Sequence, residues 1–540
     1  MATNLQQFPL SKFDGGYNSF SQSKSLVQDN EIPYGSNVLL DDNGSATKRL
    51  GRTAYSGPFA ANRRIAGMGQ LRNSSYNRLV AASGTQWWDG SGGVPVPLTG
   101  TSFTDDKETR FAQAFDKLYG ANGTDSLAYT ANAGTVVQIS TFGNVGDWPV
   151  FWNGSLYMTN SANPDRIMYS NPFRFDATTN PPTITGFDDA NMFNTDLAAV
   201  PKKDAGYFSL LPGSGVRITC LYRDGDILYA ATEAHGLWQM GAVSAPNANG
   251  SRSHQISQVV AAGGIPSGKS LAKVSQNDLW YYGGDNVYAR GEVQYYNSLR
   301  VTAKTGRVKS EMSSVATAGK SGVAGAFYLS KAYFAYQTGI YNDRVIAYDS
   351  ILNAWGTPFS GWNVQQFMER IEADGTRRLL AGSSNPADPY LYQLQSGLSD
   401  NGSPIPAVFE TKSTDCGEAG LKKRFAFVDV FYSMVAGTVS YQVFVDEVNQ
   451  VNLAGSAALG NSLSTSVGVG SQPVGSFPVG MEYKTGTSFA ALAANSVLRI
   501  YCQYTAGKRI SVRFSNNNLG EQFRVNGIVI WFKSGNINER

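Results

Sequence analysis

The sequence predicts an all-β protein: a β-propeller of about six blades with an extended N-terminal arm and a C-terminal β-sandwich. Three observations lead to this prediction. Short apolar runs alternate with Gly, Asn, Asp and Pro breaks over most of the 540 residues. A pair of strand-like segments recurs at intervals of roughly 40 to 70 residues, which overlaps the spacing of known propeller repeats. After residue 400, longer segments alternate apolar and polar residues more regularly.

The arm is expected over residues 1–55, the propeller over 56–400 and the sandwich over 401–540. The arm has turn signals at Asp14-Gly15-Gly16 and at Asp42-Asn43-Gly44. Its isolated apolar residues cannot form a core of their own, so we expect the arm to pack against another domain or other chains. These residues are Phe8, Phe13, Tyr17, Phe20 and Ile32.

The recurring segment is a strand, a few small or polar residues, and a second strand rich in aromatic residues. One such sheet cannot bury both of its faces, so several are expected to stack radially around a channel. The segment appears five times, as Leu79–Trp88, Val150–Thr159, Ile227–Met240, Leu279–Tyr288 and Leu379–Leu394. In addition, VIAYDSILNAWG, residues 345–356, resembles the end of a kelch repeat but occurs once.

The best candidate for a helix is Glu108–Tyr119, where Phe111, Phe115 and Leu118 have helical spacing. A strand fits that segment almost as well. The sandwich is predicted from five alternating segments: Arg424–Tyr432, Gly437–Phe444, Val497–Tyr504, Arg509–Phe514 and Phe523–Phe532. The Gly- and Ser-rich stretch Ala454–Val479 is expected to be a long loop.

Composition limits the class of partner. Charged residues make up only 16% of the chain, and 44 basic against 41 acidic residues give a net charge of +3. Such a chain has no overall attraction to nucleic acid or to an anionic membrane. A surface that is polar through small uncharged residues is instead common where neighbouring subunits cover it.

The three cysteines, Cys220, Cys416 and Cys502, lack the close spacing of a metal or redox motif, and we expect buried, reduced thiols. The N-terminal segment has no apolar signal region. No apolar run approaches the ~18 to 20 residues of a membrane span. We therefore expect a soluble chain that is not exported by a standard signal and does not span a membrane.

The sharpest motif is Gly263–Ser270, which satisfies the phosphate-loop formula G-x-x-x-x-G-K-[ST] in every letter. In such a loop, backbone amides and the lysine hold phosphates at the start of a helix. Residues 256–262 could supply the preceding strand, and Asp429 could mimic the acidic partner. However, only LAKVSQ separates Ser270 from the next turn, which is too short for the crossover helix. We interpret the match as chance and expect no nucleotide cofactor.

Other candidates for chemistry are few. His235 and His254 are the two histidines, and neither has an obvious partner. Carboxylates that could form an acid–base pair or a calcium site lie in turns, at Asp41-Asp42, Asp105-Asp106 and Asp224-Gly225-Asp226. We therefore assign no catalytic, cofactor-binding or metal-binding residue and expect no enzyme activity.

Basic residues occur in pairs or runs at Lys48-Arg49, Arg63-Arg64, Lys202-Lys203, Arg377-Arg378 and Lys422-Lys423-Arg424. Most are expected on the solvated surface. A channel that conducts DNA would use scattered, weak charge, because strong phosphate contacts slow passage.

Several segments in the same order resemble the propeller-type hub or nozzle proteins of short-tailed bacteriophages. These segments are residues 13–52 (FDGGYNSF…KRLGR), 155–176 (SLYMTNSANPDRIMYSNPFRFD), 263–282 (GGIPSGKSLAKVSQNDLWYY) and 398–412 (LSDNGSPIPAVFETK). The resemblance consists of turn and strand patterns over most of the chain, and it transfers no functional residue.

The resemblance implies a structural virion protein: a tail nozzle or hub subunit that forms part of the distal channel for genome ejection. Its implied partners are further copies in a ring, expected to be a homohexamer, tail adaptor or portal-associated proteins, tail fibres or spikes, and DNA in transient, non-specific contact. Two alternatives remain open. One is a propeller tail protein that binds or cleaves host surface glycans; the other is a tail-tip or minor tail protein of a long-tailed phage.

Overall fold

The structure is a computed structural model that describes residues 5–19, 23–139, 145–176, 183–187, 192–193, 205–244, 252–260, 263–275, 278–293, 298–433, 437–458 and 496–535. The chain divides into two compact units. Unit 1 comprises Met1–Gly51, Ile346–Phe359 and Gln395–Arg540. Unit 2 comprises Arg52–Val345 and Ser360–Leu394.

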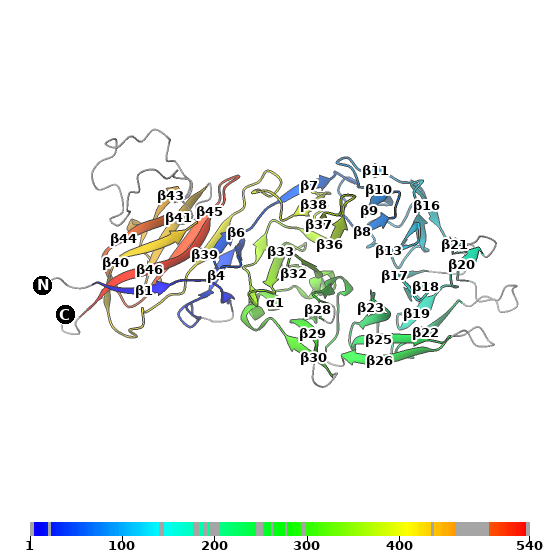
Figure 1. Ribbon diagram of the computed structural model, residues 1–540, viewed down its shortest axis with the longest axis horizontal. Coiled ribbons are helices and arrows are strands. Elements are labelled where there is room, and N and C mark those ends of the chain that lie inside the picture. The colour runs from blue at the N-terminus through cyan, green and yellow to red at the C-terminus, as the bar shows by residue number, and fades with distance from the viewer. Residues whose placement is uncertain are drawn as a thin grey trace. The chain divides into compact units, whose positions relative to one another are not determined.

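Small sheets follow one another along the chain from β8 to β38, and Figure 1 shows them arranged as the blades of a propeller. The first sheet consists of β8 (Gly67–Arg72), β9 (Asn77–Ser83), β10 (Gln86–Asp89) and β11 (Val96–Pro97). The second consists of β12 (Thr99–Gly100), β13 (Arg110–Ala114), β14 (Lys117–Ala121), β15 (Ala128–Thr130) and β16 (Thr135–Gln138). The third consists of β17 (Gly146–Trp152), β18 (Ser155–Asn160), β19 (Arg166–Tyr169) and β22 (Gly206–Ser209). Between β19 and β22, β20 (Arg174–Asp176) pairs with β21 (Thr183–Gly186).

The next two sheets consist of β23 (Ile218–Asp224), β24 (Ile227–Thr232), β25 (Gly236–Val243) and β26 (His254–Val260); and β27 (Ala272–Lys273), β28 (Leu279–Tyr282), β29 (Val287–Val293) and β30 (Ser298–Ala303). The last two consist of β31 (Ala324–Tyr328), β32 (Lys331–Tyr336), β33 (Arg344–Asp349), β34 (Ala354–Trp355) and β35 (Phe359–Ser360); and β36 (Val364–Ile371), β37 (Arg377–Ser383), β38 (Leu391–Leu394) and β7 (Arg52–Ser56).

The last sheet joins the two ends of unit 2. Its outer strand, β7, precedes all the other sheets in the chain and pairs with β38, so that Ala54 lies opposite Tyr392. The Arg52 guanidinium stacks on the Tyr392 ring at 3.8 Å. Strand pairing between the two ends of the unit therefore helps to hold the ring of sheets closed.

The predicted recurrence has a clear structural cause. Four of the five recurring segments span the second and third strands of one sheet, whereas Val150–Thr159 spans the first and second, β17 and β18. The second strand is buried almost throughout, as in β9, β18 and β24. A strand covered on both faces is apolar in nearly every position and is therefore conspicuous in the sequence. The Asn153-Gly154 step between β17 and β18 has the positive φ angles, 44° and 78°, that a tight hairpin requires.

The described residues contain seven such sheets, one more than the expected number of about six. The recurrence missed the sheets that contain β14–β15 and β32–β33. The helix predicted over Glu108–Tyr119 is wrong, because β13 and β14 form a hairpin there. Its turn contains Phe115 at φ 56°. Phe111, Phe115 and Leu118 have helical spacing by coincidence, because they lie on two short paired strands and the turn between them.

Helical structure in the described residues is confined to single turns. These are α1 (Lys309–Ser313) and the 3-10 turns η3 (Gly268–Ser270), η4 (Gly306–Val308), η5 (Thr317–Gly322) and η6 (Val451–Leu453).

Unit 1 contains two six-stranded sheets. One consists of β44 (Ser496–Gly507), β40 (Lys423–Tyr432), β46 (Arg524–Ser534), β6 (Ala46–Lys48) and β5 (Val38–Leu40), with β1 (Gln6–Leu10) paired to β46. The other consists of β4 (Tyr34–Ser36), β39 (Ala407–Glu410), β45 (Ile510–Asn516), β41 (Thr438–Val445) and β42 (Val448–Asn449), with β43 (Gly455–Ala458) paired to β41. A short parallel pair, β2 (Gly16–Tyr17) and β3 (Glu31–Ile32), also belongs to this unit.

The strands described within residues 1–51 pair into these sheets, so the segment expected as an extended arm over residues 1–55 packs against another part of the chain, which is one of the two expected alternatives. Phe13 is fully buried and its ring meets that of Phe409 edge-on at 5.5 Å. Leu10, Tyr17 and Ile32 are also buried, whereas Phe20 lies outside the described residues. Two of the unit boundaries fall after Gly51 and after Leu394. Of the predicted loop Ala454–Val479, residues 455–458 form β43 and residues 459–479 lie outside the described residues.

Candidate functional site

A cavity of about 440 Å³ lies in unit 2, at the place where the first strands of several sheets begin. Arg64 precedes β8, Glu108 precedes β13, Arg217 precedes β23, and Gln365 is the second residue of β36. Charged residues therefore enter one space from sheets that are far apart in the sequence. The lining is rich in charged and polar side chains, and we take this cavity as the candidate functional site.

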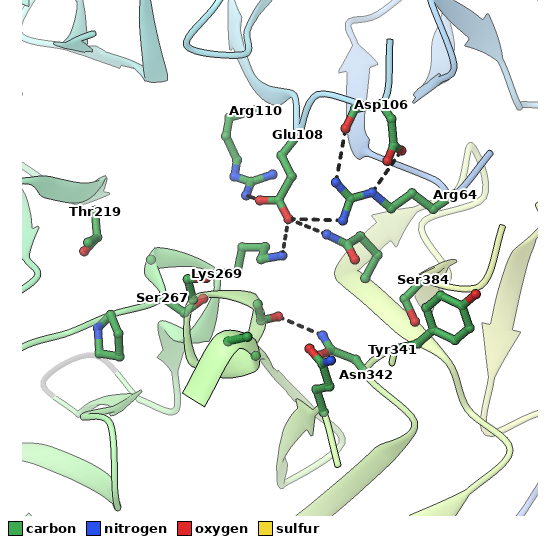
Figure 2. Close-up of a pocket in the computed structure, with 18 of the residues that line it drawn as sticks. Arg64, Asp106, Glu108, Arg110, Thr219, Ser267, Lys269, Tyr341, Asn342 and Ser384 are labelled. Atoms are coloured by element: carbon green, nitrogen blue, oxygen red, sulfur yellow. Dashed lines mark hydrogen bonds and ion pairs between the residues drawn. The ribbon is translucent and has the colours of Figure 1, made fainter. Parts of the chain in front are cut away.

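Glu108 is at the centre of this cluster (Figure 2). Its Oε1 atom accepts a hydrogen bond of 2.7 Å from Lys269 Nζ and another from Gln365 Nε2. Its Oε2 atom accepts one from Arg110 Nη2. Arg64 Nη1 lies 3.9 Å from Oε1, and Arg64 also binds Asp106 at 3.0 Å. One carboxylate thus connects side chains from four separate segments of the chain.

Burial and charge have opposite effects on these groups. Burial alone would raise the pKa of Glu108, but the adjacent Lys269 and Arg110 hold it well below the usual range. Burial lowers the pKa of Lys269 to about 8, against the attraction of Glu108. Glu108 is therefore ionised at neutral pH and cannot act as a general acid there. Most of the Lys269 population still carries its charge at pH 7.

Asp147 and Trp148 form a second part of the wall. Trp148 sits at an interruption of the β17–β18 register and has φ 54°, a left-handed conformation that is rare for a bulky residue. The Arg110 guanidinium lies 4.7 Å from its ring centre. Burial raises the pKa of the neighbouring Asp147, while Arg110 opposes this shift. The irregular strand thus places an aromatic ring and a carboxyl group at the cavity.

The phosphate-loop match runs into this site, but with different local structure. Gly268–Ser270 forms the single 3-10 turn η3, and the strand β27 starts at Ala272. The motif lysine, Lys269, is buried and bound to Glu108. The motif serine, Ser270, donates to the Ser267 carbonyl at 2.7 Å. The side chains that would hold a nucleotide and its metal are thus engaged within the protein.

The glycine of that turn, Gly268, has a packing role. A Cβ atom at this position would lie 2.4 Å from the Thr219 carbonyl oxygen and 2.7 Å from Trp148 Cζ2. The absence of a side chain lets η3 approach β23 and the indole closely. This requirement gives a physical reason for the glycine that is unrelated to phosphate binding.

The two histidines lie apart from the cavity. His235 is exposed in the turn between β24 and β25. His254 begins β26 and is surrounded by the rings of Trp152, Tyr157, Tyr169 and Phe208, with Phe208 stacked on it at 4.2 Å. Burial lowers the pKa of His254 to about 4.

The carboxylates singled out from the sequence do not form an acid–base pair. Asp105 and Asp106 bind Arg63 and Arg64, respectively. Asp224 binds Lys273, and the Asp226 carbonyl accepts a bond of 2.9 Å from Trp152 Nε1. In unit 1, Asp41 accepts from the backbone N–H groups of Asn43 and Ser45 and binds Arg524, whereas Asp42 is exposed. Among the described residues, no group of three or more His, Cys, Asp or Glu side chains could hold a metal ion.

The cysteines are buried as expected, but some of the basic residues expected on the surface are buried too. Cys220, Cys416 and Cys502 are free and buried, and burial raises the pKa of each thiol to about 12. Lys48, Arg49 and Lys423 are buried rather than solvated. Arg49 makes two hydrogen bonds to the Asp400 carboxylate, of 2.8 and 2.5 Å.

The other basic positions fall into three groups, of which Arg64 and Arg378, both half-buried, form one. Arg63, Arg377, Lys422 and Arg424 are exposed, and Lys202-Lys203 lies outside the described residues. No helix in the part of the chain that the structure describes is long and apolar enough to cross a membrane.

Sequence reasoning found Lys269 and Asp106 but missed the residues that define the site, above all Glu108, Arg110 and Asp147. These residues lie just before the innermost strand of a sheet or in the first two positions of that strand. No local sequence pattern identifies such positions as functional. Once the second strands are recognised, that position can be located about ten residues upstream of each. This signal would have pointed to Asp147, which precedes β18, but not to Glu108 and Arg110, because β14 belongs to a sheet that the recurrence missed.

No family model and no curated protein sequence matches the chain. Several solved structures are similar in fold. The WD40 β-propeller domain of Doa1 is 7% identical, with a TM-score of 0.39, and the match covers 64% of this chain and 96% of that one. BamB from Moraxella catarrhalis is 10% identical, with a TM-score of 0.37 and coverage of 67% and 94%. The computationally designed protein Ika8 is 10% identical, with a TM-score of 0.33 and coverage of 63% and 99%. The description of unit 2 as a β-propeller rests on its own sheets.

Proposed function

We propose that this chain is a structural subunit of a virus tail, a nozzle or hub component with no catalytic activity of its own. In this proposal unit 2 is a seven-bladed propeller and unit 1 a β-sandwich completed by the N-terminal strands. The subunits form a closed homo-oligomeric ring, expected to be a hexamer, attached to adaptor or portal proteins. The ordered resemblance of four segments to tail hub proteins and the low charge of the chain support this function.

The observation that carries the proposal is an exposed aromatic face on the sheet β44-β40-β46 in unit 1. Tyr501 and Tyr504 of β44 are 67% and 50% exposed. The Phe427 ring lies 6.4 Å from the Tyr501 ring and 5.4 Å from the Trp531 ring. Large apolar groups gathered on a surface indicate contact with another protein, and Tyr, Trp and Phe are enriched in such contacts.

The backbone of β44 supports this interpretation. Gln503 and Tyr504 have φ angles of 51° and 57°, next to an interruption of the β40–β44 register. Each such non-glycine conformation costs on the order of 1–2 kcal/mol. At the centre of the same face, Arg499 binds Asp429 at 2.7 Å and stacks on Phe427 at 4.0 Å. A strained backbone and an arginine held in place beside exposed aromatic rings are both features of a binding surface.

The cavity of unit 2 agrees better with a non-catalytic role than with glycan cleavage. A glycosidase of the usual kind needs one carboxyl group that donates a proton and a second that is ionised. Burial raises the pKa of Asp147, which makes it the carboxyl group of the lining suited to donate a proton. The two carboxylates that could act as its ionised partner are engaged, because Glu108 is bound by three cations and Asp106 by Arg64. The cross-linked side chains also obstruct the axis of unit 2, so in this proposal DNA passes through the centre of the ring of subunits.

Imaging tests the proposal most directly. We expect cryo-electron microscopy of the virus particle to place this chain at the distal end of the tail, in six copies around the channel. A single copy, or a pair on a two-fold axis, would contradict the ring. Absence of the chain from the particle would contradict the function.

A variant tests the aromatic face. We expect Tyr501→Ser combined with Tyr504→Ser to leave the isolated chain folded, because both side chains are exposed, but to reduce its incorporation into particles at least tenfold. Tyr207→Ser, at a 60% exposed tyrosine of β22, is the matched control and should be incorporated normally. Normal incorporation of the double variant would exclude this face as the contact.

A further inference from the structure

The cavity of unit 2 has a volume and a lining that the structural role does not require. We propose that it is a binding site for a saccharide unit, a neutral ligand rich in hydroxyl groups. The volume of about 440 Å³ falls within the range of about 300–1,000 Å³ that is usual for small-molecule sites. The proposal concerns unit 2 by itself and does not depend on assembly into a tail.

The space exists because one wall has almost no side chains. This wall is the turn η5, where Ala318, Gly319, Ser321 and Gly322 face the cavity. A Cβ atom at Gly319 would lie 2.6 Å from Gln337 Oε1, so a larger residue cannot stand there without displacing Gln337. The opposite wall holds the charged cluster around Glu108. The result is a recess with a small, neutral side and a polar side.

The charges of the polar side exclude two classes of ligand. Four basic residues, Arg64, Arg110, Arg217 and Lys269, face three acidic ones, Asp106, Glu108 and Asp147. An anion that binds Lys269 or Arg110 would have to displace Glu108, which already binds both. An apolar ligand would remove water from these groups without replacing its hydrogen bonds, which is costly. A ligand that both donates and accepts hydrogen bonds meets neither obstacle.

Individual side chains provide such bonds. Ser384 lines the cavity and is 4% exposed, and its Oγ atom has no hydrogen-bond partner among the described residues. Asn342 donates both amide hydrogens to backbone carbonyls, of Gly322 at 2.7 Å and of Val364 at 2.9 Å. These two bonds fix the amide plane and leave its oxygen as the group that can accept from a ligand. Figure 2 shows Asn342, Tyr341 and Ser384 on the side of the cavity away from Thr219 and Ser267.

The site is also rigid. Glu108 is held by partners on other sheets, and Gln365 is fixed by its bond to Glu108. Preorganised polar groups lose little conformational entropy on binding. Sugar hydroxyls form hydrogen bonds with carboxylates, amides and guanidinium groups. The cavity lining has all three kinds of group. The ligand class that best matches the cavity is therefore one residue of a neutral glycan, bound with millimolar affinity.

Saturation-transfer NMR on the isolated full-length chain tests the proposal. The probes are the methyl glycosides of glucose, galactose, mannose, rhamnose and N-acetylglucosamine. We expect saturation transfer to at least one of them. Ala318→Trp, at an exposed position on the cavity wall, should abolish the transfer by filling the recess, and Ser384→Ala should weaken it. Ala373→Trp, at an exposed position in the turn after β36, is the matched control and should bind as the natural chain does.

Three outcomes would overturn the proposal. The first is no transfer to any of the five glycosides. The second is transfer that persists unchanged in Ala318→Trp while circular dichroism shows both tryptophan variants folded, because the sugar would then bind elsewhere. The third is competition by inorganic phosphate or citrate at equal concentration, since the site would then select anions.

Discussion

Glu108 accepts a hydrogen bond of 2.7 Å from Lys269, although the two residues are 161 positions apart in the sequence. Arg110 and Gln365 bind the same carboxylate. The lysine of a phosphate-loop match is thus one side of a link between distant sheets. This relationship changes what the motif predicts: Lys269 stabilises unit 2 and is not available to a nucleotide.

Lys269→Ala should therefore lower the melting temperature of the chain and leave nucleotide affinity undetectable before and after the change. Removing one partner of a buried ion pair costs about 3–5 kcal/mol. We expect about 2 kcal/mol here, because Arg110 and Gln365 still bind Glu108. Thermal unfolding followed by circular dichroism measures the first effect, and titration with a fluorescent ATP analogue the second.

Lys273→Ala is the control for this prediction. Lys273 is 40% exposed and binds Asp224, and exposed pairs contribute about 0–1 kcal/mol. Its melting temperature should match that of the natural chain. Lysine-dependent ATP binding at micromolar concentration would contradict our interpretation of the motif.

Gly268→Ala should destabilise the chain more than Gly263→Ala, although both glycines belong to the motif. A methyl group at residue 268 meets the Thr219 carbonyl oxygen at 2.4 Å, and a backbone atom cannot move aside easily. At residue 263 there is open space, and the cost is the φ of +78°, about 1 kcal/mol. Urea unfolding of the two variants should give the lower midpoint for residue 268. The reverse order would mean that packing against β23 is not what residue 268 provides.

The fold could be predicted from the sequence where burial is continuous. The second strands of the sheets, such as Leu79–Ser83 and Ile227–Thr232, are covered on both faces and stand out as apolar runs. The hairpin Arg110–Ala121 did not stand out in this way, because the apolar residues of its two strands together have the spacing of a helix. The role of residues 1–51 was also hidden, since β1, β4 and β6 pair with strands that lie more than 350 residues later.

The site could not be predicted for a related reason. Glu108, Lys269 and Gln365 meet only when the ring of sheets closes, and no short-range pattern encodes that approach. Lys269 was noticed because it completes a motif, and the motif suggested the wrong partner. Pairs of buried charges such as Arg49 and Asp400 show the same limit, because a basic doublet in a sequence indicates a solvated surface by default.

Phe13→Ala should destabilise unit 1 strongly. Phe13 is fully buried against Phe409, and removing a buried Phe ring costs about 3–5 kcal/mol. Phe8→Ala, at a half-buried position in β1, should cost less. Deletion of residues 1–51 should then impair folding itself and not assembly alone. Urea unfolding followed by tryptophan fluorescence measures these effects. Unchanged stability of Phe13→Ala would mean that the N-terminal strands do not add to the core.

The last prediction concerns acid. His254 is enclosed by four aromatic rings, and its Nε2 atom lies 3.2 Å from the Tyr157 hydroxyl. Burial, with a smaller contribution from nearby Arg252, lowers the pKa of His254 from 6.5 to about 4. The unfolded chain therefore binds a proton at this residue between pH 6.5 and 4 while the folded chain does not. Protons then favour unfolding, and stability must fall as the pH decreases through this window.

His254→Gln retains a polar side chain of similar length but cannot be protonated in this range. We expect its melting temperature at pH 7.5 to be close to that of the natural chain, and its decline between pH 6.5 and 4.5 to be clearly shallower. His235→Gln, at the exposed histidine, is the control and should keep the full decline. Differential scanning calorimetry at several pH values measures all three chains. If all three show equal slopes, the acid sensitivity arises from carboxylates that lose their ion pairs, and the aromatic enclosure of His254 does not set it.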